Sequence, residues 1–182
     1  LNILTIDESL TLLTSSKPGL AHTTIGNNKE PLKKIDDFAA KIIEIQGNVD
    51  IAFLKLCYVD ITESTDIPKV FNHYKTTMNI LKSNYPDVTF IHVTTPLTVD
   101  KKGAINIIKR LSGRRVGGYE DNVARYQYNT MMKEEYSGKE PVFDLASIES
   151  TDPEGNQMLK ILKGKEYTSL REAYTYDGGH LN

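Results

Sequence analysis

Two hydrophobic periods alternate along this chain, and their order limits the fold more than any other feature of the sequence. Apolar residues recur every three or four positions over 31–45 and again over 67–85, which predicts two amphipathic helices. Nearly continuous apolar runs cover 50–58 and 88–94, and such runs are typical of strands that are buried on both faces. A helix, strand, helix, strand order is therefore explicit in the first half of the sequence.

The same alternation extends toward both ends of the chain. Short strands are predicted at 3–6 and 142–145, and helices at 102–111 and 122–136. Strands and helices that alternate with short connections favour a mainly parallel sheet, and right-handed crossovers make it a doubly wound, three-layer α/β sandwich. With 182 residues the chain has the size of one domain, so we expect residues 1–182 to form a single domain.

Charge and composition argue against several classes of protein. The 22 lysines and arginines and the 24 acidic residues leave a net charge of -2, which provides no global attraction for nucleic acid. No apolar run approaches the roughly 18 residues of a membrane span. No signal peptide is recognisable, so a secreted or periplasmic location would require an upstream signal that has been removed. The single cysteine, Cys57, lies in an apolar run and is predicted to be a buried thiol.

The carboxyl ends of the predicted strands indicate where a ligand would bind. In doubly wound sheets the ligand lies beyond these ends, where loops from several units converge. The segments predicted to meet there are 59–66, 94–102 and the chain that follows Leu145.

The last of these segments carries the residues with the clearest chemistry, Asp177-Gly178-Gly179-His180. Two glycines allow one tight turn to bring the carboxylate and the imidazole together. The carboxylate can then fix the tautomer of the ring and stabilise its protonated form when the other nitrogen takes a proton from a hydroxyl. We therefore predict that Asp177 and His180 are the acid and the base of a catalytic site.

The stretch from Asp177 to Leu181 resembles the Asp-x-x-His block near the carboxyl end of the SGNH (GDSL-type) hydrolase superfamily. The resemblance implies a flavodoxin-like sandwich and a serine hydrolase that acts on acyl esters, with acetyl groups on carbohydrate as candidate substrates. It also implies that His180 acts as general base and then as general acid, that Asp177 orients it, and that no cofactor takes part.

Two further segments fit the resemblance in part. Residues 57–60 stand where the superfamily carries a Gly-x-Asn-Asp-like block, and Asp60 is the candidate substrate-binding residue because the asparagine is absent. Residues 23–28 correspond to the block in which a glycine N–H helps to bind the oxyanion, so Gly26 is the candidate donor and Asn28 a supplement. A plain Gly-Asn turn ahead of a helix explains the second segment equally well.

The nucleophile is the missing piece of the resemblance. The superfamily places its serine in a Gly-Asp-Ser-like motif after the first strand, and this sequence has no such motif. Ser9 is the nearest, weak candidate. The preferred interpretation is that the nucleophile lies upstream of Leu1 and that the fold continues beyond Asn182, so that this chain is one domain truncated at both ends.

Other polar clusters leave alternative functions open. Asn122, Arg125 and Asn129 share one helical face and would either contact a polar substrate such as a sugar or cap and solvate the helix. Six basic residues would either bind a carboxylate or phosphate or form a solvated loop; they are Lys101, Lys102, Lys109, Arg110, Arg114 and Arg115.

Metal catalysis is not predicted, because the four histidines are scattered without zinc-type spacing; they are His22, His73, His92 and His180. The first functional hypothesis is therefore a serine esterase acting on a small-molecule or carbohydrate ester. The alternative is a non-catalytic domain of the same fold that binds a glycan or a partner protein.

Overall fold

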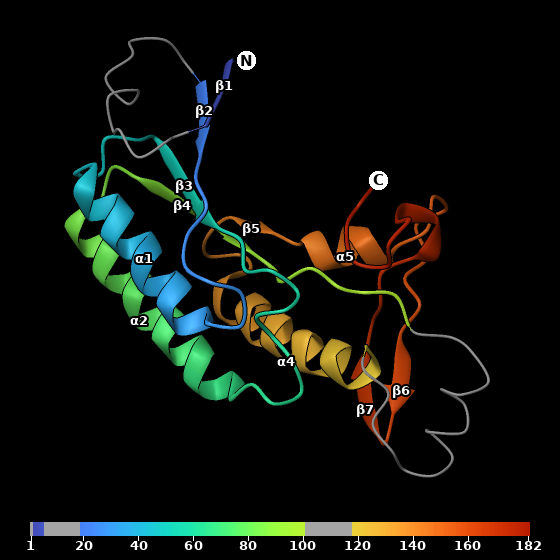
Figure 1. The fold of residues 1–182 in the computed structure, drawn as a ribbon. Coiled ribbons are helices and arrows are strands. Elements are labelled where there is room, and N and C mark those ends of the chain that lie inside the picture. The colour runs from blue at the N-terminus through green and yellow to red at the C-terminus, as the bar shows by residue number, and fades with distance from the viewer. Residues whose placement is uncertain (1, 6–18, 101–117) are drawn as a thin grey trace.

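The computed structural model describes residues 2–5, 19–100 and 118–182 (Figure 1). Three predictions fall outside these ranges. They are the helix at 102–111, the basic cluster within 101–115 and the candidate nucleophile Ser9.

The largest described sheet is parallel and has three strands in the order β3-β4-β5. They are β3 (Ile51–Leu54), β4 (Thr89–Val93) and β5 (Val142–Phe143). A second parallel pair joins β1 (Asn2–Thr5) to β2 (Gly19–His22). The only antiparallel pair among the described strands is the hairpin of β6 (Lys160–Leu162) and β7 (Lys165–Tyr167). The prediction of an α/β fold with a mainly parallel sheet is confirmed.

Three long helices pack against this sheet, namely α1 (Pro31–Glu44), α2 (Ile67–Asn84) and α4 (Tyr119–Tyr136). Figure 1 shows α1 and α2 lying side by side, and α4 follows next to α2. Apolar residues of all three helices share one core with β3 and β4; Ile35, Phe71 and Tyr128 are among those buried. The helices predicted over 31–45, 67–85 and 122–136 are therefore confirmed, and α4 begins three residues earlier than expected.

The two faces of β3 differ, which corrects the prediction of a strand covered on both sides. Ala52 and Leu54 are buried against the helices, whereas Ile51 and Phe53 are 56% and 49% exposed. The physical reason is that the three long helices bury their apolar faces in one core, on one face of the sheet. Cys57, predicted to be buried, is only half-buried.

The predicted strand at 142–145 is shorter than expected. Asp144 accepts a hydrogen bond from the backbone N–H of Ser147 at 3.1 Å, so it caps a helix rather than extending β5. That helix is α5 (Leu145–Ser150), and a 3-10 turn, η2 (Glu172–Tyr174), follows the β6–β7 hairpin. None of the helices in the described ranges is long and apolar enough to cross a membrane.

Candidate functional site

The loops that follow β3 and β4 meet the carboxyl-terminal turn of the chain. The ring of Tyr58, four residues after β3, lies edge-on to the ring of His180 with the centroids 5.5 Å apart. The backbone N–H of Val99, in the exit from β4, donates to the carbonyl oxygen of Gly178 at 3.0 Å. The segments predicted to converge at the carboxyl edge of the sheet are thus in contact.

Asp177 organises the turn that ends at His180. Its Oδ1 accepts the backbone N–H groups of Gly179 and His180, both at 2.8 Å, and its Oδ2 lies 2.5 Å from His180 Nδ1. The hydrogen bonds from the His180 backbone, from its ring and from the Gly179 backbone, in that order, hold the pKa of Asp177 well below its ordinary value. Asp177 is therefore ionised at neutral pH and fixes the proton of the neutral ring on Nδ1.

The two glycines between Asp177 and His180 are required by geometry. Gly178 has φ +87°, and a Cβ there would lie 2.9 Å from the side chain of Val99. A Cβ on Gly179 would lie 2.9 Å from the ring of Tyr58. Both positions therefore allow the turn to approach its neighbours closely.

The imidazole of His180 is accessible at this edge. Its side chain is 69% exposed and that of Asp177 is 57% exposed. No hydrogen bond joins Nε2 to any residue in the described part of the chain. With its proton on Nδ1, the ring presents the lone pair of Nε2 as a base. The pair predicted from sequence is thus joined and accessible, while its catalytic role stays a prediction.

The exit from β4 is held by two asparagine side chains of α4 rather than by a neighbouring strand. The amide of Asn129 pairs with both backbone groups of Thr95, at 2.7 and 2.9 Å. The amide of Asn122 pairs with both backbone groups of Thr98, at 3.1 and 2.8 Å. Asn122 and Asn129 are seven residues apart, which corresponds to a rise of about 10.5 Å along the helix. Thr95 and Thr98 are three residues apart, which corresponds to about 10 Å of extended chain, so the two amides are spaced to match the two backbone sites.

This arrangement changes the interpretation of the polar face of α4. Asn122, Arg125 and Asn129 were predicted either to contact a substrate or to cap and solvate the helix. All three are buried instead, and their polar atoms bind the loops that follow β3 and β4. Both alternatives are therefore wrong. The i, i+3, i+7 spacing of long polar residues signalled this role, but nothing in the sequence identified their partners.

Asp60, predicted to bind substrate, forms a buried ion pair. Its carboxylate accepts the Lys34 ammonium at 2.8 Å and the backbone N–H groups of Lys29 and Cys57 at 2.8 and 2.7 Å. The side chain of Asp60 has no exposed surface, and that of Lys34 is 9% exposed. The structure therefore assigns Asp60 the role of joining the loop before α1 to the loop after β3.

The other oxyanion candidates lie in the loop that Asp60 holds. Asn28 Oδ1 accepts from the Lys34 ammonium at 3.0 Å, so this amide oxygen belongs to the same cluster. Gly26 has φ +51°, and a Cβ there would lie 2.8 Å from the Lys34 side chain. Its backbone N–H makes no hydrogen bond to a described residue, so it is the candidate in this loop with a donor to offer.

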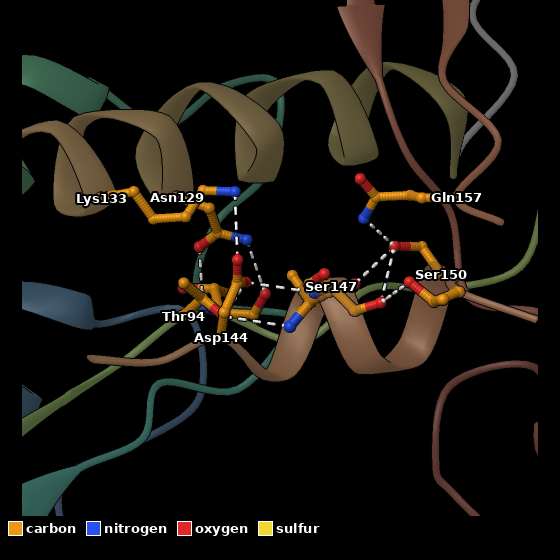
Figure 2. A network of polar contacts seen from close by, with 10 residues as sticks. Thr94, Asn129, Lys133, Asp144, Ser147, Ser150 and Gln157 are labelled. Carbon is orange, nitrogen blue, oxygen red and sulfur yellow. Dashed lines mark hydrogen bonds and ion pairs between the residues drawn. The ribbon is translucent and has the colours of Figure 1, made fainter. Parts of the chain in front are cut away.

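A polar network fastens α5 to the start of the β4 exit (Figure 2). The hydroxyl of Thr94 donates to Asp144 Oδ1 at 3.1 Å and accepts the backbone N–H of Ala146 at 3.0 Å, while Lys133 pairs with the other Asp144 oxygen at 3.1 Å. Ser150 donates back to the Ala146 carbonyl at 2.7 Å. The serine hydroxyl is engaged within its own helix, so the network is structural.

Glu149, also on α5, is a second buried carboxylate near the site. Its Oε2 accepts the backbone N–H of Leu97 at 2.6 Å. Burial raises its pKa to about 7, and the hydrogen bond from Leu97 and the charges of Lys55 and Arg125 oppose this only in part. Sequence reasoning missed Glu149, because nothing in its local sequence marks it as buried.

A groove with a volume of about 660 Å³ lies between the starts of α1 and α2. Its lining includes Lys29, Lys33 and Lys69 together with Val59 and Thr62, and it contains no residue of the Asp177–His180 turn. The groove therefore does not coincide with the Asp177–His180 pair.

Two other described histidines, His92 and His73, have structural partners. His92 is fully buried, with Nδ1 2.8 Å from the Tyr74 hydroxyl and Nε2 3.0 Å from Glu140, and burial lowers its pKa. His73 lies 2.6 Å from Asp36 on the surface. No group of three or more potential metal ligands occurs within residues 2–5, 19–100 and 118–182.

Comparison with known proteins adds a structural similarity. The chain is similar to a solved structure described as "The structure of a putative platelet activating factor from Streptococcus pneumonia", with 17% identity and a TM-score of 0.49. The match covers 100% of this chain and 76% of that chain. No protein-family model matches the chain, and no curated protein matches it. The chemistry of the site is therefore argued from its own geometry.

Proposed function

We propose that this chain is a serine ester hydrolase of the SGNH type, built on a doubly wound sandwich, and that it acts on acyl esters such as acetyl groups on carbohydrate. The observation that carries the proposal is the hydrogen bond between Asp177 Oδ2 and His180 Nδ1, 2.5 Å long, in an exposed turn at the carboxyl edge of a parallel sheet. Ligands of α/β sheets bind at this edge.

In the proposed reaction a serine hydroxyl attacks the ester carbonyl and its proton passes to Nε2 of His180. Ionised Asp177 stabilises the resulting imidazolium through Nδ1. The imidazolium then protonates the leaving alcohol, and water releases the acyl group from the serine by the same steps in reverse order. The backbone N–H of Gly26 is the proposed oxyanion donor.

The nucleophile is the part of the proposal that needs direct identification. No serine or threonine hydroxyl in the described ranges is hydrogen-bonded to His180, and Ser9 lies outside them. A fluorophosphonate probe reacts covalently with an activated serine, so labelling followed by peptide mass spectrometry would locate the nucleophile. We expect one labelled serine in the full-length protein, including any residues that precede Leu1, and its label should disappear in His180→Ala.

Turnover of p-nitrophenyl acetate by the full-length protein, including any residues that precede Leu1, tests the role of His180. The loss of a general base typically slows a reaction by roughly 10²–10⁴-fold, so kcat/KM of His180→Ala should fall within that range. His73→Ala is a matched control, because His73 also lies beside a carboxylate, Asp36, at 2.6 Å, but on the helical surface. Equal activity of the His180→Ala and wild-type chains would rule out the proposed mechanism.

A second candidate function is a non-catalytic domain of the same fold that binds a glycan or a partner protein. The groove between α1 and α2 favours it, because the hollow lies beside Asp60 and not beside His180. This candidate predicts no fluorophosphonate labelling of the full-length wild-type protein. It also predicts that charge reversal at Lys33 and Lys69, which line the groove, weakens binding of the partner.

A further inference from the structure

Arg125 is a buried cation in the middle of α4, with 2% of its surface exposed. Its Nε donates to the carbonyl oxygens of Tyr58 and Ile61 at 2.9 and 3.1 Å. Its Nη1 donates to the Thr98 hydroxyl at 2.9 Å and to the Asn122 side chain at 2.7 Å. One guanidinium therefore joins the loop after β3 to the exit from β4.

Both of these segments contact the turn that carries His180. On one side, the Tyr58 ring lies against the His180 ring, and the guanidinium of Arg125 lies 5.7 Å from the centre of the same Tyr58 ring. On the other side, the residue after Thr98 donates its backbone N–H to the carbonyl oxygen of Gly178. Arg125 thus touches the direct neighbours of the turn on both sides, without touching His180 itself.

We propose that Arg125 is a positioning residue for His180, which fixes the imidazole by locking the Tyr58 loop and the Thr98 segment to each other. Only the expected change in kcat/KM rests on the proposed function. The position of the His180 ring can be measured without any reaction.

An arginine suits this position for a physical reason. The guanidinium is planar and offers five N–H donors in a fixed fork, so it can serve two loops at once, whereas a lysine ammonium is a point charge on a flexible stem. Burial lowers the pKa of Arg125 to about 10, which still leaves it charged at neutral pH. The carbonyl oxygens of Tyr58 and Ile61 both lose a hydrogen bond when the guanidinium is removed.

The test compares Arg125→Lys and Thr98→Val with Arg171→Lys in the full chain. Thr98→Val removes the hydroxyl that accepts from Nη1 and preserves the shape of the side chain, so it supplies a milder variant if Arg125→Lys does not fold. Arg171→Lys makes the same change at a surface arginine whose side chain pairs only loosely with Asp152, at 3.9 Å. Thermal melting establishes that each variant is folded.

The readouts are the nuclear Overhauser effect between the ring protons of Tyr58 and His180, and kcat/KM for p-nitrophenyl acetate. We expect Arg125→Lys to weaken the ring-to-ring effect at least twofold and to lower kcat/KM roughly tenfold, with a smaller loss in Thr98→Val and none in Arg171→Lys. Unchanged ring contacts in folded Arg125→Lys and Thr98→Val would overturn the inference. Absence of turnover by the full-length wild-type protein, including any residues that precede Leu1, would instead defeat the proposed function. The ring contact would still decide the role of Arg125.

Discussion

Asp60 and Asp177 organise their surroundings in the same way but in opposite environments. Each carboxylate accepts hydrogen bonds from two backbone N–H groups and from one basic side chain, Lys34 for Asp60 and His180 for Asp177. The backbone donors to Asp60 come from two loops, whereas those to Asp177 come from one tight turn. The side chain of Asp60 is completely buried, whereas that of Asp177 is more than half exposed.

The difference lies in what the basic partner can do. The side chains of Lys34 and Asp60 are both enclosed, so their ion pair is a fixed connection between the loop before α1 and the loop after β3. The ring of His180 is 69% exposed, and its Nε2 has no hydrogen-bond partner among the described residues. Similar hydrogen bonding thus encloses the basic partner of one carboxylate and leaves that of the other accessible for the proposed proton transfer.

The largest expected effect is on activity, from Asp177→Asn. The variant side chain can keep Oδ1 as acceptor of the two backbone N–H groups, which places its NH₂ group against Nδ1 of His180. Nδ1 must then accept, so the proton of the ring moves to Nε2 and the base is lost. We expect p-nitrophenyl acetate kcat/KM to fall roughly 10³-fold or more, with the thermal midpoint close to that of the wild type.

The same experiment can contradict the distinction between a structural Asp60 and a catalytic Asp177. A variant that retained activity but melted far below the wild type would show that Asp177, like Asp60, serves structure alone. Ring nitrogen chemical shifts of His180, measured by NMR, would report the tautomer directly and separate this outcome from a simple loss of substrate binding.

The next largest effect is on stability, from Asp60→Asn. The new NH₂ group would face the Lys34 ammonium and the Cys57 N–H, which both donate to Oδ2 in the wild type. Removing one partner of a buried ion pair typically costs about 3–5 kcal/mol, so denaturant unfolding should show a loss of this size. Asp36→Asn, at an exposed carboxylate, is the control. A loss below about 1 kcal/mol would mean that the buried pair is not the fixed connection we describe.

The sequence predicted the helices and strands better than the polar contacts that connect them. The helices over 31–44 and 67–84 follow from local apolar spacing, and the Asp177–His180 contact follows from two glycines between neighbours in sequence. By contrast, Asp60 is predicted to bind substrate from its place in the block that resembles the SGNH superfamily, and its partner Lys34 is 26 residues away in the chain. Long-range pairing of polar groups leaves no periodic signal in a single sequence.

The burial of β3 shows the same limit from the apolar side. A continuous apolar run indicated two covered faces, but Ile51 and Phe53 are about half exposed because α1, α2 and α4 share one core. Whether an apolar side chain is covered depends on where distant helices pack, and the run itself does not encode that.

The smallest predicted effect sharpens the comparison with a third carboxylate, Glu149. It is buried like Asp60 and accepts the backbone N–H of Leu97, but no basic side chain is hydrogen-bonded to it within the described residues, and its pKa is raised to about 7. The folded chain therefore holds this proton more tightly than the unfolded chain, whose glutamate titrates near 4.3. Its contribution to stability is complete below that value and is lost as the pH rises through about 7.

Glu149→Gln should remove this loss, because glutamine is neutral at every pH and retains an oxygen for the Leu97 N–H. The free energy of unfolding of the variant, minus that of the wild type, should therefore rise by roughly 1–3 kcal/mol between pH 5 and pH 8. Urea unfolding at several pH values measures the difference, with Glu134→Gln on the exposed face of α4 as the control. A difference that stays constant with pH would mean that Lys55 and Arg125 stabilise the buried charge as well as Lys34 stabilises Asp60, and the distinction drawn between the carboxylates would then be lost.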